Sequence, residues 1–196
     1  MSSPHDPTRR KVVAALASLP LLGASQSCFV GNNPSGDSKV LVAYFTRTGN
    51  TSVIAGLLER AQQADVFQIQ PATAYPQDYL ETVEQARQER DSNFEPALAA
   101  HVTNMAGYHV VFLGFPIWGE TAPPVIKSFL SAHDLAGKIV VPFITHGGYG
   151  AGSSLQVLAR YAPKAVLHKG FEMQADQERK TMEQVNGWLG DLKLPA

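Results

Sequence analysis

The stretch Val40-Leu-Val-Ala-Tyr-Phe-Thr-Arg-Thr-Gly-Asn-Thr51 decides the fold of this chain. An almost continuous apolar run over 39–45 is typical of a β-strand that is covered on both faces. Hydroxyl, glycine and amide residues follow at once, and a helical pattern begins at about Asn50. The first amides of a helix have no internal acceptor, and the helix dipole favours negative charge there. The stretch therefore predicts a strand, an anion-binding loop and a helix in succession.

The remainder of the chain repeats this alternation of strand and helix. Further strands are predicted at 64–70, 110–115, 138–145 and 165–168. Helices are predicted at 50–62, 78–90, 123–136, 153–161 and 176–189, with a short additional helix near 97–105. Five successive strand–helix units predict an α/β sandwich with a parallel sheet and right-handed crossovers.

The helix predicted at 78–90 is rich in charged residues. Its apolar positions are Leu80, Val83 and Ala86. Its charged positions are interpreted as a solvated face without a chemical role: Glu81, Glu84, Arg87 and Glu89. In the last helix, Trp188 is predicted to be a packing anchor.

Residues 1–28 are expected to be an export signal and not part of the folded domain. A polar start ends in Arg9-Arg10-Lys11, and an apolar run follows from Val12 to Ala24, which is the layout of such a signal. The arginine pair resembles a bacterial twin-arginine signal, which exports proteins already folded. Residues 29–38 are predicted to be a flexible linker, and 39–196 the folded domain. The expected location is the periplasm or another exported compartment.

Cys28 is the only cysteine, so no internal disulfide can form. Because it follows the apolar run directly, lipid attachment at Cys28 is the alternative to a free exported protein. A net charge of −1 gives no reason to expect nucleic acid as a partner. A membrane is expected as a partner only if Cys28 is lipidated.

Several classes of protein are excluded because the sequence lacks the motifs that they require. It contains no phosphate-binding Gly-x-x-x-x-Gly-Lys-Ser/Thr loop, no dinucleotide-type glycine triplet after the first strand and no Gly-x-Ser-x-Gly elbow. Phe115-Pro116 stand at the end of the third strand, where a phosphoacceptor aspartate would be needed. The histidines show no ligand spacing, so no metal site is expected.

Three loops, at 46–51, 116–121 and 146–150, follow the first, third and fourth predicted strands. Because the carboxyl ends of parallel strands meet at one edge of the sheet, these loops are expected to converge on a ligand. The candidate binding residues are those of the three loops: Thr46, Arg47, Thr48, Gly49, Asn50, Thr51, Pro116, Ile117, Trp118, Gly119, His146, Gly147, Gly148, Tyr149 and Gly150.

The residue types in these loops fit a flat aromatic cofactor that carries one phosphate. The hydroxyls of Thr46, Thr48 and Thr51 and the loop amides can bind a phosphate without a lysine. Trp118 offers a stacking face, and the glycines near His146 let backbone amides approach polar ring edges. No side chain is assigned a catalytic role.

The segment Thr46-Arg-Thr-Gly-Asn-Thr51 resembles the phosphate loop of flavodoxins, whose pattern is Ser/Thr-x-Thr-Gly-Asn-Thr. Tyr75-Pro76 with Tyr79, Gly114-Phe-Pro-Ile-Trp118 and Pro142-Phe-Ile-Thr-His-Gly-Gly148 resemble a bacterial flavodoxin subfamily. The resemblance covers about 39–190. It implies a flavodoxin-like three-layer sandwich with five parallel strands in the order 2-1-3-4-5 and FMN as cofactor.

Carried over to this chain, the resemblance implies that Thr46–Thr51 hold the FMN phosphate. Pro116–Gly119 would flank the isoalloxazine with Trp118 against the ring, and His146–Gly150 would border its other side. Gly119 departs from the subfamily, which often has a bulky residue there. Arg47 would either pair with the phosphate or point to solvent, and His146 would either contact the flavin or only bond the backbone.

The expected function is that of an exported, FMN-binding, flavodoxin-like electron-transfer protein. Its partner would be a redox protein or a small-molecule electron acceptor. The alternative is an FMN-dependent NAD(P)H:quinone-type oxidoreductase, so whether the protein is an enzyme stays open. A flavin-free binding module on the same fold is the third reading.

Overall fold

The computed structural model describes residues 40–174 and 178–192. The predicted export signal, the linker and Cys28 lie outside the described residues, as do the first residues of the last predicted helix. Within the described residues, no helix is both long enough and apolar enough to cross a membrane.

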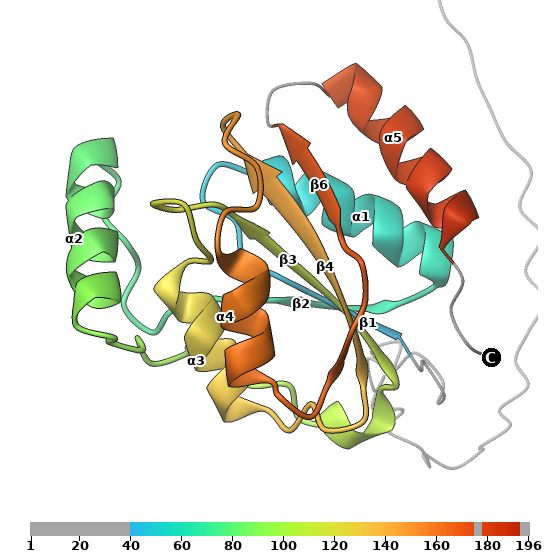
Figure 1. Ribbon diagram of the computed structural model, residues 1–196, viewed down its shortest axis with the longest axis horizontal. Coiled ribbons are helices and arrows are strands. Elements are labelled where there is room, and N and C mark those ends of the chain that lie inside the picture. The colour runs from blue at the N-terminus through green and yellow to red at the C-terminus, as the bar shows by residue number, and fades with distance from the viewer. Residues whose placement is uncertain (1–39, 175–177, 193–196) are drawn as a thin grey trace, which may run out of the picture. The chain divides into compact units, whose positions relative to one another are not determined.

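The centre of the domain is a parallel sheet (Figure 1). Its strands follow one another across the sheet in the order β2-β1-β3-β4-β5, and every pairing is parallel. The fold class and the strand order are therefore confirmed. The strands are β1 (Val40–Tyr44), β2 (Asp65–Gln68), β3 (Val110–Pro116), β4 (Ile139–His146), β5 (Val166–Leu167) and β6 (Phe171–Gln174).

The fifth position of the sheet is built from two short strands, and the sequence predicted only the first of them. Both β5 and β6 pair with β4, and the residues between them form a bulge opposite Val141 and Pro142. Proline has no amide hydrogen and cannot complete a regular ladder. Gly170 lies so close to the Pro142 carbonyl that a Cβ would collide with it. The edge strand is therefore interrupted beside this proline.

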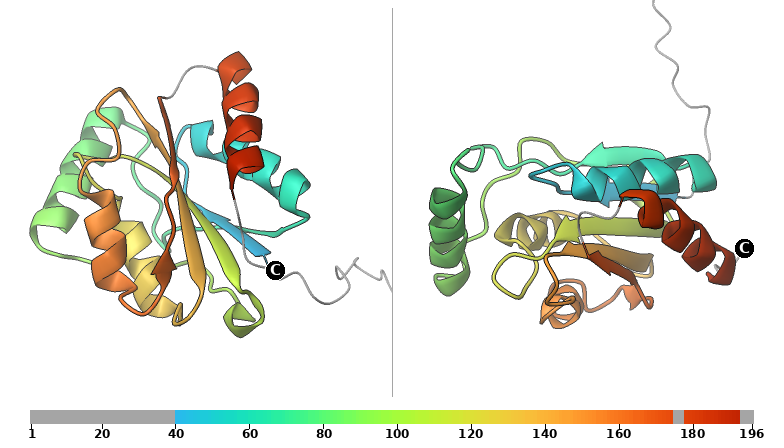
Figure 2. Two further views of the ribbon diagram at one scale, coloured as in Figure 1. Left: turned by 45° about the vertical axis from the view of Figure 1, so that its right-hand side comes forward. Right: turned by 90° about the horizontal axis from the view of Figure 1, so that it is seen from above.

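Two apolar cores lie on opposite faces of the sheet, because side chains alternate along each strand. Leu41 and Phe45 of the first strand–loop segment belong to the core beneath α3 (Pro124–Ala132) and α4 (Ser154–Tyr161). Val42 belongs to the other core, beneath α1 (Asn50–Gln62) and α5 (Glu178–Asp191). Figure 2 shows these helix pairs on either side of the sheet, which gives the three predicted layers.

The packing role predicted for Trp188 is confirmed. Its ring stacks on Phe171 with centroids 5.2 Å apart and meets the Phe112 ring edge-on at 5.9 Å. The last helix is therefore fixed to β6 and to the middle of the sheet.

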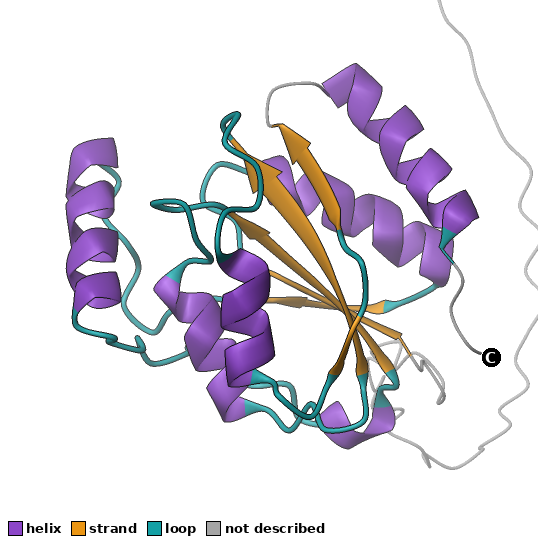
Figure 3. Cartoon of the chain, in the orientation of Figure 1, coloured by secondary structure: helices purple, strands orange, loops and turns teal. Residues whose placement is uncertain are grey.

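The predicted helix α2 (Tyr79–Asp91) forms but covers neither face of the sheet, and Figure 3 shows it standing apart from the other helices. Its first turn is capped by Asp78, whose carboxylate accepts the Glu81 amide at 3.0 Å. The predicted apolar positions Leu80 and Val83 are 72% and 46% exposed, whereas Glu89 is only 7% exposed. The solvated face predicted for this helix is therefore wrong at Glu89.

Glu89 is buried because partners compensate its polar carboxylate. Its Oε2 accepts the Tyr75 hydroxyl at 2.8 Å, and its Oε1 accepts the Gln85 amide nitrogen at 2.8 Å. A buried carboxylate requires such partners. The bond from Tyr75 attaches α2 to the loop before it, which a helical periodicity cannot reveal.

The short helix predicted near 97–105 is wrong. Leu98 instead forms an antiparallel bridge with Pro71, and the Ala99 amide donates to the Gln70 carbonyl at 2.8 Å. This pairing holds the backbone extended. Only a single 3₁₀ turn, η1 (Met105–Gly107), follows before β3.

Two glycine substitutions test the packing of the sheet. Gly114 faces the Phe143 ring on β4, and a Cβ would collide with that ring. We expect Gly114→Ala to lower the free energy of unfolding by about 1–3 kcal/mol, because overpacking displaces a buried ring. The measurement is urea denaturation followed by circular dichroism.

Gly56→Ala is the matched control within α1. Its Cβ would meet only the flexible end of Arg60, and alanine favours the helix by about 0.5–1 kcal/mol over glycine. We expect this variant to be slightly more stable than wild type. Equal effects of the two substitutions would contradict the packing described for Gly114.

Candidate functional site

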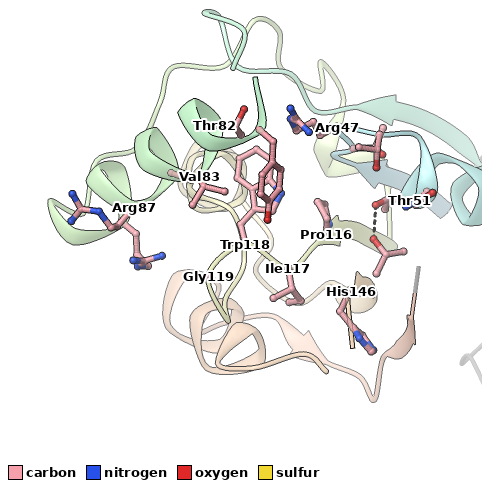
Figure 4. A pocket seen from close by; sticks show the side chains of 18 residues that line it. Arg47, Thr51, Thr82, Val83, Arg87, Pro116, Ile117, Trp118, Gly119 and His146 are labelled. Carbon is pink, nitrogen blue, oxygen red and sulfur yellow. Dashed lines mark hydrogen bonds between the residues drawn. The ribbon is translucent and has the colours of Figure 1, made fainter. Parts of the chain in front are cut away.

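A cavity of about 400 Å³ opens where β1, β3 and β4 end, between the loops that follow these strands and α2 (Figure 4). The convergence of the three loops predicted from the sequence is thus found. Residues from all three loops and from α2 line it: Thr46, Arg47, Thr48, Asn50, Thr51, Tyr79, Thr82, Val83, Ala86, Arg87, Arg90, Pro116, Ile117, Trp118, Gly119, Thr145, His146 and Gly147.

The loop after β1 turns sharply at Gly49, which has φ of 93° and serves as the N-cap of α1. Glycine takes this left-handed conformation without a steric penalty. The Gly49 amide donates to Thr46 Oγ1 at 3.1 Å, and Ser52 Oγ donates to the Gly49 carbonyl at 2.6 Å. The loop is therefore held by its own polar groups.

This turn leaves the start of α1 rich in available donors. Among the hydrogen bonds of the described residues, none is made by the backbone amides of Thr48, Asn50 or Thr51. Gly49 does not line the cavity itself, but its conformation produces this arrangement. Unpaired amides at a helix start form an anion site.

Thr51 is buried beneath this loop, with only 1% of its surface exposed. Its hydroxyl pairs with the Thr145 hydroxyl of β4 at 2.9 Å, drawn as a dashed line in Figure 4. One of the two hydroxyls donates in this bond, so one proton remains free for a further acceptor. Thr145 was not predicted as a site residue; its place just before His146 at the end of β4 was the available signal.

The sequence left open whether Arg47 pairs with the phosphate or points to solvent, and in this structure Arg47 contacts other parts of the chain. Its Nη2 donates to the Gln77 carbonyl at 2.7 Å, and its guanidinium lies 6.0 Å from the centre of the Tyr79 ring. Arg47 lines the cavity and connects the loop after β1 to the start of α2.

Trp118 lies at the centre of the cavity wall, half-buried in an aromatic cluster. It meets Phe45 and Tyr75 edge-on, with ring centroids 5.2 and 4.9 Å away. Tyr75 is fixed in turn by Glu89, and burial together with this hydrogen bond raises the pKa of its hydroxyl well above the usual value. The indole is therefore held rigidly where it borders the cavity.

Gly119, beside this tryptophan, has φ of 58°, and the following Glu120 has φ of 63°. A positive φ at a non-glycine residue stores strain. A Cβ on Gly119 would collide with the guanidinium of Arg90 from α2. At Gly119 the side chain of Arg90 from α2 thus lies directly against the loop after β3.

The loop after β4 borders the cavity through His146 and Gly147 only. His146 Nδ1 accepts the Gly148 amide at 3.0 Å, so the backbone-bonding role left open for His146 is present. Gly148, Tyr149 and Gly150 do not line the cavity, and Tyr149 is 85% exposed. Their place beside the ligand therefore stays a prediction.

A further contact joins this loop to the one that carries Trp118. The Glu120 carbonyl accepts the Ser153 amide at 2.9 Å. Gly152 lies against the same carbonyl, and a Cβ there would collide with it. The loops after β3 and β4 are therefore fixed relative to each other.

The sequence did not predict that α2 forms a wall of the cavity. Arg87 was interpreted as a solvated residue without a role, yet it lines the cavity together with Arg90. Arg87 also forms exposed ion pairs with Glu84 at 2.7 Å and Asp91 at 3.0 Å. The only sign of this wall in the sequence was the sparse apolar pattern of the helix. In the structure, Leu80 and Val83 do not enter a core.

Comparison with known proteins gives a consistent result. The family model described as Flavodoxin matches residues 39–192. A protein of Bacteroides eggerthii, provisionally described as a flavoprotein, is 34% identical with a TM-score of 0.67; the match covers 78% of this chain and 96% of that one. A similarly described protein of Bacteroides uniformis is 31% identical with a TM-score of 0.67, over 76% of this chain and 97% of that one.

A flavoprotein of Lactobacillus acidophilus, solved in complex with FMN, shares the fold at 18% identity, with a TM-score of 0.62 over 74% of this chain and 98% of that one. No curated protein matches the chain. The match over nearly the whole described domain, the strand order and the glycine turn at the start of α1 lead to one conclusion: the chain belongs to the flavodoxin family.

Proposed function

We propose that this protein binds FMN and acts as an exported electron-transfer protein. The observation that carries the proposal is the set of unpaired amides of Thr48, Asn50 and Thr51 at the start of α1, beside a cavity bordered by Trp118. The Lactobacillus acidophilus relative of the same fold was solved with FMN. The family membership adds to this support.

The residues present fit the phosphate end of FMN. The three amides and the free proton of the Thr51–Thr145 pair are donors, and no aspartate or glutamate of the described residues lines the cavity to repel a dianion. The Thr46 hydroxyl oxygen accepts the Gly49 amide, so the hydroxyl proton is available to donate to the phosphate.

The remaining walls fit a flat ring system. Trp118 supplies an apolar aromatic surface that is fixed by Phe45 and Tyr75. The Trp118–Gly119 peptide is the backbone group proposed to face the polar edge of the ring. Bound FMN supplies transfer of one or two electrons, while the protein binds it, orients it and excludes water.

The phosphate assignment predicts a preference for FMN over riboflavin. We expect the apoprotein to bind FMN at least ~100-fold more tightly, because several charge-assisted hydrogen bonds of about 1.5–3 kcal/mol are lost without the phosphate. Fluorescence titration with each flavin measures both dissociation constants. A protein that stays colourless with FMN would instead favour the flavin-free binding module.

Thr46 offers a conservative test of the loop. We expect Thr46→Val to weaken FMN binding about tenfold with little effect on riboflavin, because the hydroxyl holds the Gly49 turn and donates to the phosphate. Thr46→Ser retains the hydroxyl and should bind FMN as wild type does. Loss of affinity for both flavins in equal measure would argue against a phosphate role.

Gly119 tests the proposed peptide beside the ring. We expect Gly119→Ala to shift the flavin midpoint potential by about 40–60 mV, the effect of losing a hydrogen bond of ~1 kcal/mol in a one-electron couple. Gly137→Ala is the matched control, since Gly137 also has a positive φ but nothing lies near its Cβ and it does not line the cavity. Equal potentials in Gly119→Ala and wild type would contradict the assignment.

Export through a twin-arginine signal is proposed from the sequence alone. A protein that loads its cofactor before export has a reason to cross the membrane folded. We expect Arg9→Lys with Arg10→Lys to retain the uncleaved, FMN-loaded precursor inside bacterial cells, as judged by fractionation. Metabolic labelling with a fatty acid in wild type and Cys28→Ala separates a lipid anchor from a free exported protein.

A further inference from the structure

The charged side chains that line the cavity all carry the same sign. Among the described residues they are Arg47, Arg87 and Arg90, and no carboxylate lines the cavity. Arg47 is already engaged by the Gln77 carbonyl and the Tyr79 ring. Binding of the flavin phosphate at the start of α1 therefore gives no role to the two arginines of α2.

Arg87 lies across the cavity from the loop proposed to hold that phosphate. In Figure 4, Arg87 and Thr51 lie at opposite sides of the cavity, with Trp118 between them. The two arginines are three positions apart on a helix, and such residues are neighbours on one face. A phosphate at the start of α1 leaves this second cationic end of the cavity without an anion from the ligand, and its present partners are the carboxylates of Glu84 and Asp91.

Both guanidinium groups can donate hydrogen bonds to a further anion. Arg87 pairs with Glu84 and Asp91, but the side chains of all three are about half exposed, at 51%, 51% and 52%. Exposed pairs of this kind contribute little and exchange readily. Arg90 is 33% exposed and lies 3.3 Å from Asp91, while its other face rests against Gly119. An arriving anion can therefore displace the carboxylates.

The same helix presents apolar surface next to these arginines. Val83 and Ala86 line the cavity, and Tyr79 lies one turn before Val83 with 67% of its surface exposed. Apolar walls with a few placed charges are typical of small-molecule sites. A molecule that combines an apolar ring with an anionic group matches this combination.

We propose that Arg87 and Arg90 form a second anion subsite, which holds an anionic group on the small molecule that exchanges electrons with the flavin. This inference rests on the proposed function. Two sources supply the same chemistry: an acidic quinone that takes electrons from the flavin, or the phosphate of a reduced nicotinamide dinucleotide that gives them. In the first case the quinone gains two electrons and two protons and becomes a hydroquinone, and the reduced flavin loses the same.

The test uses FMN-loaded wild type and the double variant Arg87→Gln with Arg90→Gln. FMN affinity and the flavin potential are measured first, because Arg90 lies against Gly119 and a change in either quantity would affect the anionic and the neutral reagent alike. Photoreduced protein is then mixed anaerobically in a stopped-flow instrument with 1,4-naphthoquinone and, separately, with its 2-sulfonate. A second arm mixes oxidised protein with NADPH and with the neutral 1-benzyl-1,4-dihydronicotinamide.

We expect the double variant to lose about tenfold or more of its rate with the anionic reagent of one arm. Its rate with the neutral reagent of that arm should stay equal to wild type, and the difference should shrink at high salt. A selective loss with the sulfonate identifies an acceptor subsite; a selective loss with NADPH identifies a donor subsite. Arg60→Gln on α1, which does not line the cavity, should react as wild type does.

Rates that fall equally for anionic and neutral reagents, or that do not change, would overturn the subsite. A chain that never binds FMN contradicts the proposed function and the subsite together. A loaded protein with unselective rates contradicts the subsite alone, so the two failures are distinguishable.

Discussion

The left-handed turn at Gly49 is the constraint on which the candidate site depends. By reversing the chain directly after β1, it starts α1 with the amides of Thr48, Asn50 and Thr51 unpaired. The Thr46 hydroxyl fixes the turn, and the Thr51–Thr145 bond ties it to β4. The donors are thereby held in place before any ligand arrives, which reduces the entropy lost on binding.

The position of α2 adds a second feature to this site. The helix is kept beside the cavity by polar contacts, chiefly Tyr75 with Glu89 and Arg47 with the Gln77 carbonyl, and not by a core on the sheet. Few buried apolar contacts imply a low local stability. The wall that carries Arg87 and Arg90 is therefore the part of the cavity whose geometry can adjust to a reaction partner.

Much of the fold followed from local patterns, because buried parallel strands and strong turn residues are visible in sequence. The apolar run before Thr46 predicted β1. The loops after β1, β3 and β4 were predicted to meet at the carboxyl edge of the sheet. The burial of Glu89 did not follow, since it depends on the Tyr75 hydroxyl, and the exposure of Leu80 did not follow, since it depends on where α2 stands relative to the sheet. β6 was missed because the break in the edge strand opposite Pro142 is a tertiary effect.

A crystal structure of the FMN-loaded protein would locate the phosphate directly. We expect the phosphate within hydrogen-bond distance, about 2.7–3.2 Å, of the amides of Thr48, Asn50 and Thr51, with the ring beside Trp118. A phosphate bound by Arg87 and Arg90, or a flavin outside this cavity, would contradict the central claim.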